Sequence, residues 1–188
     1  MMARARTPKE RWVEAGLQEL AAGGPEAVRV EVLAKRLGVT KGGFYGFFAD
    51  REDLLKAMLD SWEKQVSTDV LEKLDDADPQ QRAMRAQALT FDSSLFPTEL
   101  AIREWSRRDP DVAQRLHRVD AQRMELLREA VGRTCSEPIE IEARSSLAFY
   151  TAIGSHFVTV DHGEIDPKAV DAFAASLLLG EQNDTKEP

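Results

Sequence analysis

A short stretch near the N-terminus, TKGGFYGFF at residues 40–48, carries side chains that can contact a phosphate group or a base edge. Thr40 and Tyr45 offer hydroxyl groups, and Lys41 offers an ammonium group for a phosphate or a guanine edge. The phenylalanines of the stretch are spaced i, i+3 and i+4, so in a helix they share one apolar face. Lys41, Tyr45 and Gly46 then face outward. The stretch predicts a short helix that packs through its phenylalanines and presents polar groups to nucleic acid.

The residues before this stretch predict the element that positions it. Apolar residues recur there at the spacing of one helix face, namely Val30, Leu33, Ala34 and Leu37. Gly38 follows, and glycine accepts the left-handed conformation that ends a helix. Thr40 can then cap the second helix with its hydroxyl group. Two helices joined by a tight glycine-containing turn form a helix-turn-helix, which reads DNA in the major groove, although many short helical hairpins are only structural.

Further residues around this pair of helices can contact DNA. Arg29 heads the first helix and Arg51 begins the helix after the pair, so both can reach phosphates. Each glycine in the second helix costs about 1 kcal/mol relative to alanine, so this helix is either frayed without DNA or lets its backbone approach the groove. Glu31 can accept from a cytosine amine or interact with its helix dipole. The predicted DNA contacts are Arg29, Thr40, Lys41, Gly42, Gly43, Tyr45, Gly46, Phe47 and Arg51.

The segment GVTKGGFYGFFADREDLLKAML, residues 38–59, resembles the signature of the TetR family of bacterial transcriptional regulators. The resemblance covers about residues 7–60, and beyond them it rests on length and helix layout. It implies that the second helix is the recognition helix and that Tyr45 binds a phosphate. Gly46 and Phe47 stand where family members commonly carry a large aromatic residue and a histidine. Specificity then depends on Lys41, on Phe44 or Phe47 near a thymine methyl, or on DNA shape.

The distribution of charge suits a protein that touches phosphate at one end only. The 188-residue chain has a net charge of −8. Residues 1–48 nevertheless hold 8 Lys and Arg against 5 Asp and Glu, while the remainder holds 17 against 28. Its apolar runs fall far short of the roughly 20 residues that cross a bilayer, and the first residues lack the apolar core of a secretory signal. With its single cysteine, Cys135, the chain is expected to be cytoplasmic.

Helical periodicity and turn signals predict an all-α protein of about nine helices. Outside the helix-turn-helix the expected helices span about 8–22, 50–74, 79–94, 98–107, 110–132, 139–160 and 167–179. Asp-Pro pairs mark three of these starts, because aspartate caps a helix and proline suits its first turn. We expect a helix-turn-helix DNA-binding domain at 1–49, a helical effector-binding and dimerisation domain at 50–180, and a disordered tail at 181–188.

The acidic helical body has two expected roles. In proteins that resemble this chain it binds a small molecule, and the predicted pocket residues are Trp62, Phe91, Trp105, Met124, Phe149 and Tyr150. As a set they allow an aromatic-lined cavity, although any one of them is more often plain core than the wall of a ligand site. The last two helices are the most apolar, so they can pair with their copies in a second subunit or complete the monomer core. The TetR resemblance implies the homodimer.

The sequence gives little support to catalysis. It contains no phosphate-binding loop, GxSxG elbow, HExxH zinc motif or dinucleotide fingerprint. We expect no cofactor and no metal. The predicted function is that of a sequence-specific DNA-binding regulator, a repressor controlled by a small-molecule effector, acting on a palindromic operator. The alternative is a helical ligand-binding or protein-interaction module that does not bind DNA.

Overall fold

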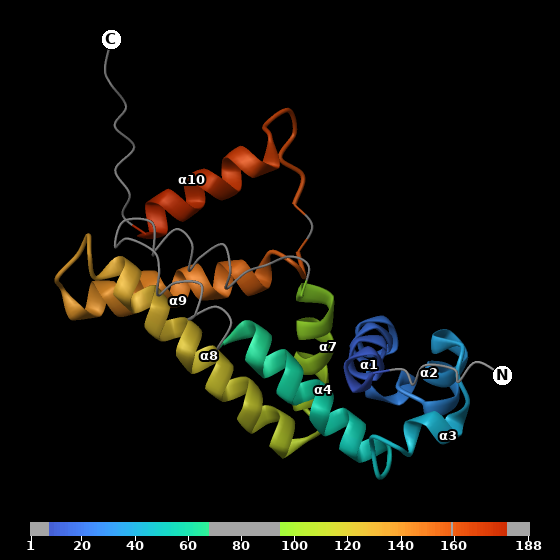
Figure 1. Cartoon of the computed structure of the whole chain (residues 1–188). Coiled ribbons are helices and arrows are strands. Elements are labelled where there is room, and N and C mark those ends of the chain that lie inside the picture. Colours follow the sequence, from blue (N-terminus) through green and yellow to red (C-terminus); the bar gives the residue numbers. More distant parts are fainter. Residues whose placement is uncertain (1–7, 68–94, 159, 180–188) are drawn as a thin grey trace. The chain divides into compact units, whose positions relative to one another are not determined.

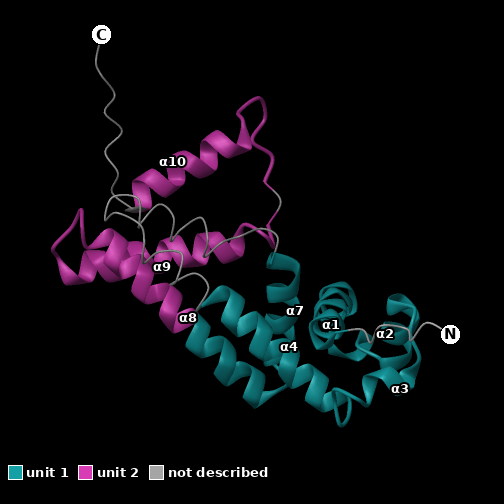
Figure 2. Ribbon diagram, viewed as in Figure 1, with its two compact units in different colours: residues 1–75, 92–119 teal, residues 76–91, 120–188 magenta. Residues whose placement is uncertain are grey.

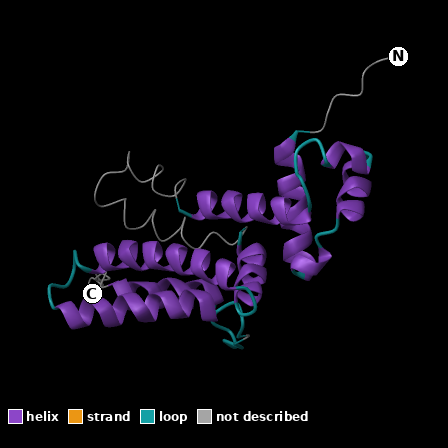
Figure 3. Ribbon diagram, turned by 90° about the horizontal axis from the view of Figure 1, so that it is seen from below, coloured by secondary structure: helices purple, strands orange, loops and turns teal. Residues whose placement is uncertain are grey.

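The computed structural model describes residues 8–67, 95–158 and 160–179, and the ordered elements of these residues are all helical (Figures 1 and 3). The all-α prediction is confirmed. The described elements are α1 (Lys9–Gly23), the 3-10 turn η1 (Pro25–Ala27), α2 (Val30–Leu37), α3 (Lys41–Phe44), α4 (Arg51–Val66), α7 (Phe96–Ser106), α8 (Pro110–Val131), α9 (Pro138–Gly154) and α10 (Pro167–Leu179). No helix within these ranges has the length and apolar character needed to span a bilayer.

The chain divides into two compact units, coloured separately in Figure 2. The first comprises residues 1–75 with 92–119, and the second comprises residues 76–91 with 120–188. Helix α8 is continuous through residues 110–131, so it contributes to both units. The expected helix at 79–94, the end of the expected helix at 50–74 and the tail at 181–188 lie outside the described residues.

In the first unit, α1 is the central element and packs against α2, α4 and α7. Its side chains Trp12 and Leu20 are fully buried, and Trp62 and Met58 reach the same core from α4. Gly16 allows close packing of the helices, because a Cβ atom there would lie 2.5 Å from the Sδ atom of Met58. Burial of these large side chains supplies most of the stabilisation of the unit, at about 25 cal/mol per Å² of apolar area.

Local capping explains where several helices begin and end. Gly38 ends α2 in the left-handed conformation (φ 66°, ψ 31°), as its sequence position predicts. At the start of α4, the Asp53 amide donates to the Asp50 carboxylate (2.8 Å) and the Ala49 amide donates to the Asp53 carboxylate (3.0 Å). The pair resembles a capping box, except that the returning hydrogen bond comes from Ala49, the residue before the N-cap, and not from Asp50 itself. Asp109 and Asp166 likewise accept hydrogen bonds from amides in the first turns of α8 and α10.

Three expectations about helix ends need correction. Thr40 occupies the N-cap position of α3, but its hydroxyl makes no capping hydrogen bond. Helix α3 spans only Lys41–Phe44 and continues as a turn, because a helix this rich in glycine gains little from each added residue. The helix expected at 139–160 ends at Gly154, where the Ser155 hydroxyl donates to the carbonyl of Ala152 (3.0 Å).

The second unit has a smaller core. Leu127 and Val131 of α8 pack with Phe149 of α9. Arg128 of α8 holds Glu142 of α9 with two hydrogen bonds, at 2.7 Å from Nε and 2.9 Å from Nη2. The Arg128 guanidinium lowers the pKa of the Glu142 carboxyl, so this carboxylate stays charged at neutral pH. Helix α10 packs against α9.

Candidate nucleic-acid interface

Helix α3 is held in place by one buried aromatic side chain. The Phe44 side chain is fully buried, with its ring centroid 5.4 Å from that of Trp12 and 5.1 Å from that of Phe48. The Phe48 amide also donates to the carbonyl of Phe44 (3.1 Å), which continues the turn beyond the last helical residue. The phenylalanines therefore pack inward, as their spacing predicts, although the helix itself is only four residues long.

Tyr45 lies on the opposite side of this short element. Its side chain is 61% exposed, and its ring meets that of Phe44 edge-on at 5.2 Å. A tyrosine held at its ring and exposed at its hydroxyl can donate a hydrogen bond to a phosphate oxygen. The geometry suits the predicted phosphate contact.

Lys41, the first residue of α3, forms an ion pair with Glu31 in the first turn of α2. The Nζ and Oε1 atoms lie 2.5 Å apart, and both side chains are more than half exposed. The hydrogen bond from Lys41 lowers the pKa of the Glu31 carboxyl, so this carboxylate is charged at neutral pH. DNA must therefore compete with Glu31 for the Lys41 ammonium group.

Arg51 has an internal role that the sequence did not indicate. Its Nε donates to the carbonyl of Val28 (2.8 Å), and its guanidinium also bonds the carbonyl of Pro25 and the carboxylate of Glu52. The side chain therefore ties the first turn of α4 to the segment that precedes α2. This positions the helix-turn-helix, while a phosphate contact by Arg51 stays a prediction.

The other predicted DNA contacts lie on or beside α2 and α3. Arg29 and Thr40 are exposed at the N-cap positions of these two helices. Gly42 and Gly46 are exposed, Gly43 is half-buried, and Phe47 packs in part against the core. A Cβ atom at Gly42 or Gly43 would meet no protein atom closer than 3.7 Å, so packing within the chain does not require these glycines.

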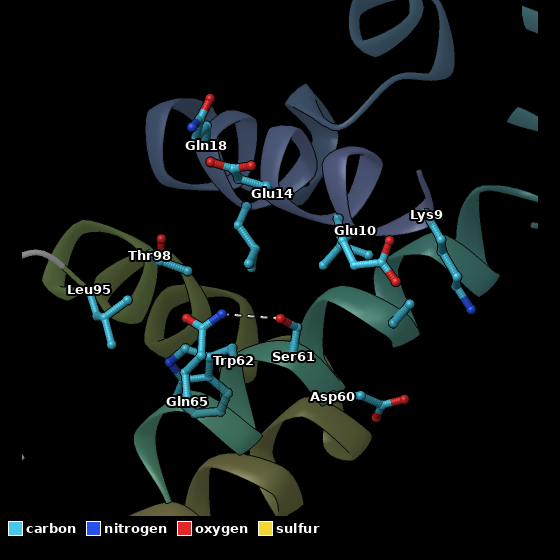
Figure 4. Close-up of a pocket in the computed structure, with 13 residues that line it drawn as sticks. Lys9, Glu10, Glu14, Gln18, Asp60, Ser61, Trp62, Gln65, Leu95 and Thr98 are labelled. Atoms are coloured by element: carbon cyan, nitrogen blue, oxygen red, sulfur yellow. Dashed lines mark hydrogen bonds between the residues drawn. The ribbon is translucent and has the colours of Figure 1, made fainter. Parts of the chain in front are cut away.

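The predicted effector-pocket residues occupy several environments. Trp62 lines a groove of about 860 Å³, shown in Figure 4, and Trp105 lines a different groove of about 590 Å³. In the second unit, Phe149 is buried and Met124 half-buried, while Tyr150 is 66% exposed. Phe91 lies outside the described residues. A single cavity lined by all six residues stays a prediction.

The described residues contain no cluster of acidic, histidine or cysteine side chains suited to a metal ion.

Comparison with known proteins identifies the helix-turn-helix region. Residues 13–58 match the family model described as bacterial regulatory proteins of the tetR family. Residues 13–58 form a TetR-family domain. In this domain α2 and α3 form the helix-turn-helix, and the exposed Tyr45 lies directly after α3. No curated protein matches the sequence.

Solved structures extend the likeness to the fold of the whole chain. A transcriptional regulator of the TetR/AcrR type from Aquifex aeolicus VF5 aligns at a TM-score of 0.64 and 15% identity, covering 90% of this chain and 96% of that one. A protein assigned to the TetR family from Mesorhizobium loti MAFF303099 aligns at 0.64 and 18% identity, covering 92% and 93%. The fatty acid degradation regulator FadR from Bacillus halodurans aligns at 0.61 and 17% identity, covering 96% and 99%. The chain thus has the fold of TetR-type DNA-binding regulators.

Proposed function

We propose that this chain is a sequence-specific transcriptional repressor that binds a palindromic operator as a homodimer and responds to a small-molecule effector. One observation carries the proposal. Burial of Phe44 fixes a short helix whose outer side presents Lys41 and Tyr45 to solvent. An ammonium group and a phenol at fixed positions can contact phosphates and a base edge together, which is the requirement for binding DNA in one register.

The remaining predicted contacts have supporting roles in this proposal. Arg29 and Thr40 contact the phosphate backbone from the two helix starts, and Phe47 lies near a thymine methyl. Gly42, Gly43 and Gly46 allow close approach of the α3 backbone to the groove. We assign DNA binding to residues 1–49, and effector binding and dimerisation to residues 50–180.

The homodimer is supported by apolar side chains that one chain leaves exposed. On α9 the exposed side chains Ile139, Leu147 and Tyr150 follow helical spacing, and Phe173 and Leu177 continue the apolar character on α10. Exposed apolar side chains gathered on two helices that pack together are typical of an association site. A two-fold dimer buries the same surface on both subunits and places two recognition helices on two half-sites.

The TetR resemblance supports two parts of this proposal, namely that the protein represses transcription and that it responds to a small molecule. Most regulators of this family are repressors, and the FadR structure is named for fatty acid degradation. We propose that effector binding shifts α4, which leads directly from the helix-turn-helix into the helical body, and so changes the spacing of the two recognition helices. The protein then acts in the cytoplasm, where both operator and metabolites are present.

The test is selection of bound duplexes from a random pool, followed by fluorescence anisotropy of the selected duplex across a salt series. We expect an inverted repeat and an affinity that falls steeply as salt rises, because phosphate contacts release counterions. A folded dimer that enriches no sequence at any salt concentration would contradict the proposal.

The alternative is a helical interaction module without DNA binding, and one observation favours it. Helix α3 is only four residues long and holds two glycines, and its lysine already has a carboxylate partner. Such a protein would bind no duplex even at low salt. The same selection experiment separates this module from a regulator.

A further inference from the structure

The first unit contains a groove between α1, α4 and the start of α7, with a volume of about 860 Å³ (Figure 4). This volume is in the range of small-molecule sites, which run from about 300 to 1,000 Å³. Apolar side chains from α1, from α4 and from the residue that precedes α7 line part of it, namely Val13, Leu17, Ala57, Trp62 and Leu95. The groove can therefore hold the apolar body of a drug-sized molecule.

The charges along the groove are unbalanced. Helix α1 contributes the carboxylates of Glu10 and Glu14, and the facing wall on α4 contributes Ser61 and Gln65 (Figure 4). The Gln65 side chain donates to the Ser61 hydroxyl (3.2 Å), which fixes both groups. Within the described ranges, neither Glu10 nor Glu14 has an ion-pair or hydrogen-bonding side-chain partner, although both face the groove.

The other charged side chains at the rim are already engaged elsewhere. The Lys9 ammonium lies 5.1 Å from the ring centroid of Phe48, in a cation–π contact. Asp60 pairs with Arg115 of α8 at 2.6 Å. The lining of the groove therefore carries more negative than positive charge, and the two glutamates of α1 lie beside an apolar wall without an ion-pair partner among the described side chains. A ligand with a positive charge at one end would complement this arrangement.

We propose that this groove binds a lipophilic organic cation, with its ammonium group at Glu10 and Glu14 and its apolar body against Trp62 and Leu17. Because the occupant would bridge α1 of the TetR-family domain and α4, binding would shift the packing of these two helices. The effect on DNA affinity rests on the proposed function, whereas binding in the groove does not.

The experiment uses three probes with one apolar body, 4-phenylbutylamine, 4-phenylbutanol and 4-phenylbutyrate, titrated into the full chain without DNA by ligand-observed NMR. We expect the amine to bind at least about fivefold more tightly than the alcohol, with the acid weakest, and added salt to reduce the advantage of the amine. The double variant Glu10→Gln/Glu14→Gln should remove this preference. The control Glu164→Gln/Asp171→Asn removes two exposed carboxylates elsewhere and should leave it unchanged.

A second variant tests the location independently of charge. Ala57→Leu narrows the groove and should weaken amine and alcohol alike, with circular dichroism as the check on folding. Equal binding of the three probes, an amine preference that survives in Glu10→Gln/Glu14→Gln, or no binding to the folded chain would overturn the proposal. Probe binding by a chain that selects no duplex would contradict the proposed function and leave the groove assignment in place.

Discussion

The helix-turn-helix region and the last two helices use apolar side chains in opposite ways. Among residues 8–67, Tyr45 is the large apolar side chain that remains well exposed, while the aromatic side chains around it are packed. Helices α9 and α10 with their connection expose Ile139, Leu147, Tyr150, Phe157, Val158, Val160, Ile165, Phe173 and Leu177. The first region therefore packs its large apolar side chains within one chain. Its exposed aromatic residue, Tyr45, is explained better by function than by packing. The second region leaves a group of apolar side chains exposed, and this is the surface that we propose for dimerisation.

The largest expected effect in this comparison is on the packing of the first region. Phe44→Ala removes a fully buried ring that contacts Trp12 and Phe48. We expect a loss of about 3–5 kcal/mol in the free energy of unfolding, measured by urea denaturation. Tyr45→Ala, one residue along and exposed, should change it far less. Similar losses for the two variants would mean that α3 is not packed through Phe44.

A charge on the exposed face of α9 tests the second region. Leu147→Glu places a carboxylate on the apolar surface, and we expect the dimer dissociation constant to rise about 30-fold, or roughly 2 kcal/mol, since central apolar contacts dominate association. Sedimentation equilibrium measures the change. Lys64→Glu, an exposed polar site on α4 and outside the proposed dimer surface, is the control. If Leu147→Glu left the dimer dissociation constant unchanged, this surface would not be the dimer interface.

The exposed side of α3 should affect DNA binding without affecting folding. Lys41→Ala and Tyr45→Phe each remove one donor to DNA, and we expect about a tenfold loss of affinity from each, near 1.4 kcal/mol. Anisotropy with the selected duplex measures it, with Lys64→Ala on α4 as the control. Full affinity in both variants would place the DNA contact elsewhere.

Glycine substitutions test what the glycines of the short helix α3 do. Gly42→Ala should raise the free energy of unfolding by about 0.5–1 kcal/mol, because its Cβ atom would meet only the Thr40 hydroxyl, at 3.7 Å. Gly38→Ala should lower it, because Gly38 has a φ of 66°. A loss of DNA affinity in a stabilised Gly42→Ala protein would show that the glycine serves backbone approach to the groove.

The smallest changes in stability and DNA affinity are expected from a substitution of Glu31. Its pKa is lowered by Lys41, so the stabilisation from this pair is present above the ordinary glutamate pKa and is lost as pH falls through the lowered one. Glu31→Gln should remove that acid sensitivity from the unfolding curve and raise DNA affinity about twofold by releasing Lys41. A fall in affinity would instead indicate that Glu31 reads a base.

Helix positions could be predicted from the sequence because local physics sets them. The apolar spacing of α2, its terminal Gly38 and the Asp-Pro starts of α8 and α10 each depend on neighbouring residues alone. The spacing of the phenylalanines also predicted the burial of Phe44 and Phe48 and the exposure of Tyr45. These are the side chains that define the candidate interface.

Other features depend on residues far apart in the chain. Arg51 bonds the carbonyls of Val28 and Pro25, which no periodicity in the sequence indicates. The groove between α1 and α4 likewise exists only after the helices pack, so Glu10 and Glu14 gave no signal as a pair. The early end of α3 depends on two opposing effects. Its glycines destabilise the helix and its phenylalanines stabilise it by packing, and helix propensity alone does not show which effect is larger.

Hydrogen–deuterium exchange of the full chain, with and without the selected duplex, tests the central claim most directly. We expect DNA to protect the amides of residues 39–48, where Lys41 and Tyr45 are presented, and to leave those of α9 and α10 unchanged. Protection confined to α9 and α10, with residues 39–48 unaffected, would contradict the assignment of α3 as the DNA-contacting element.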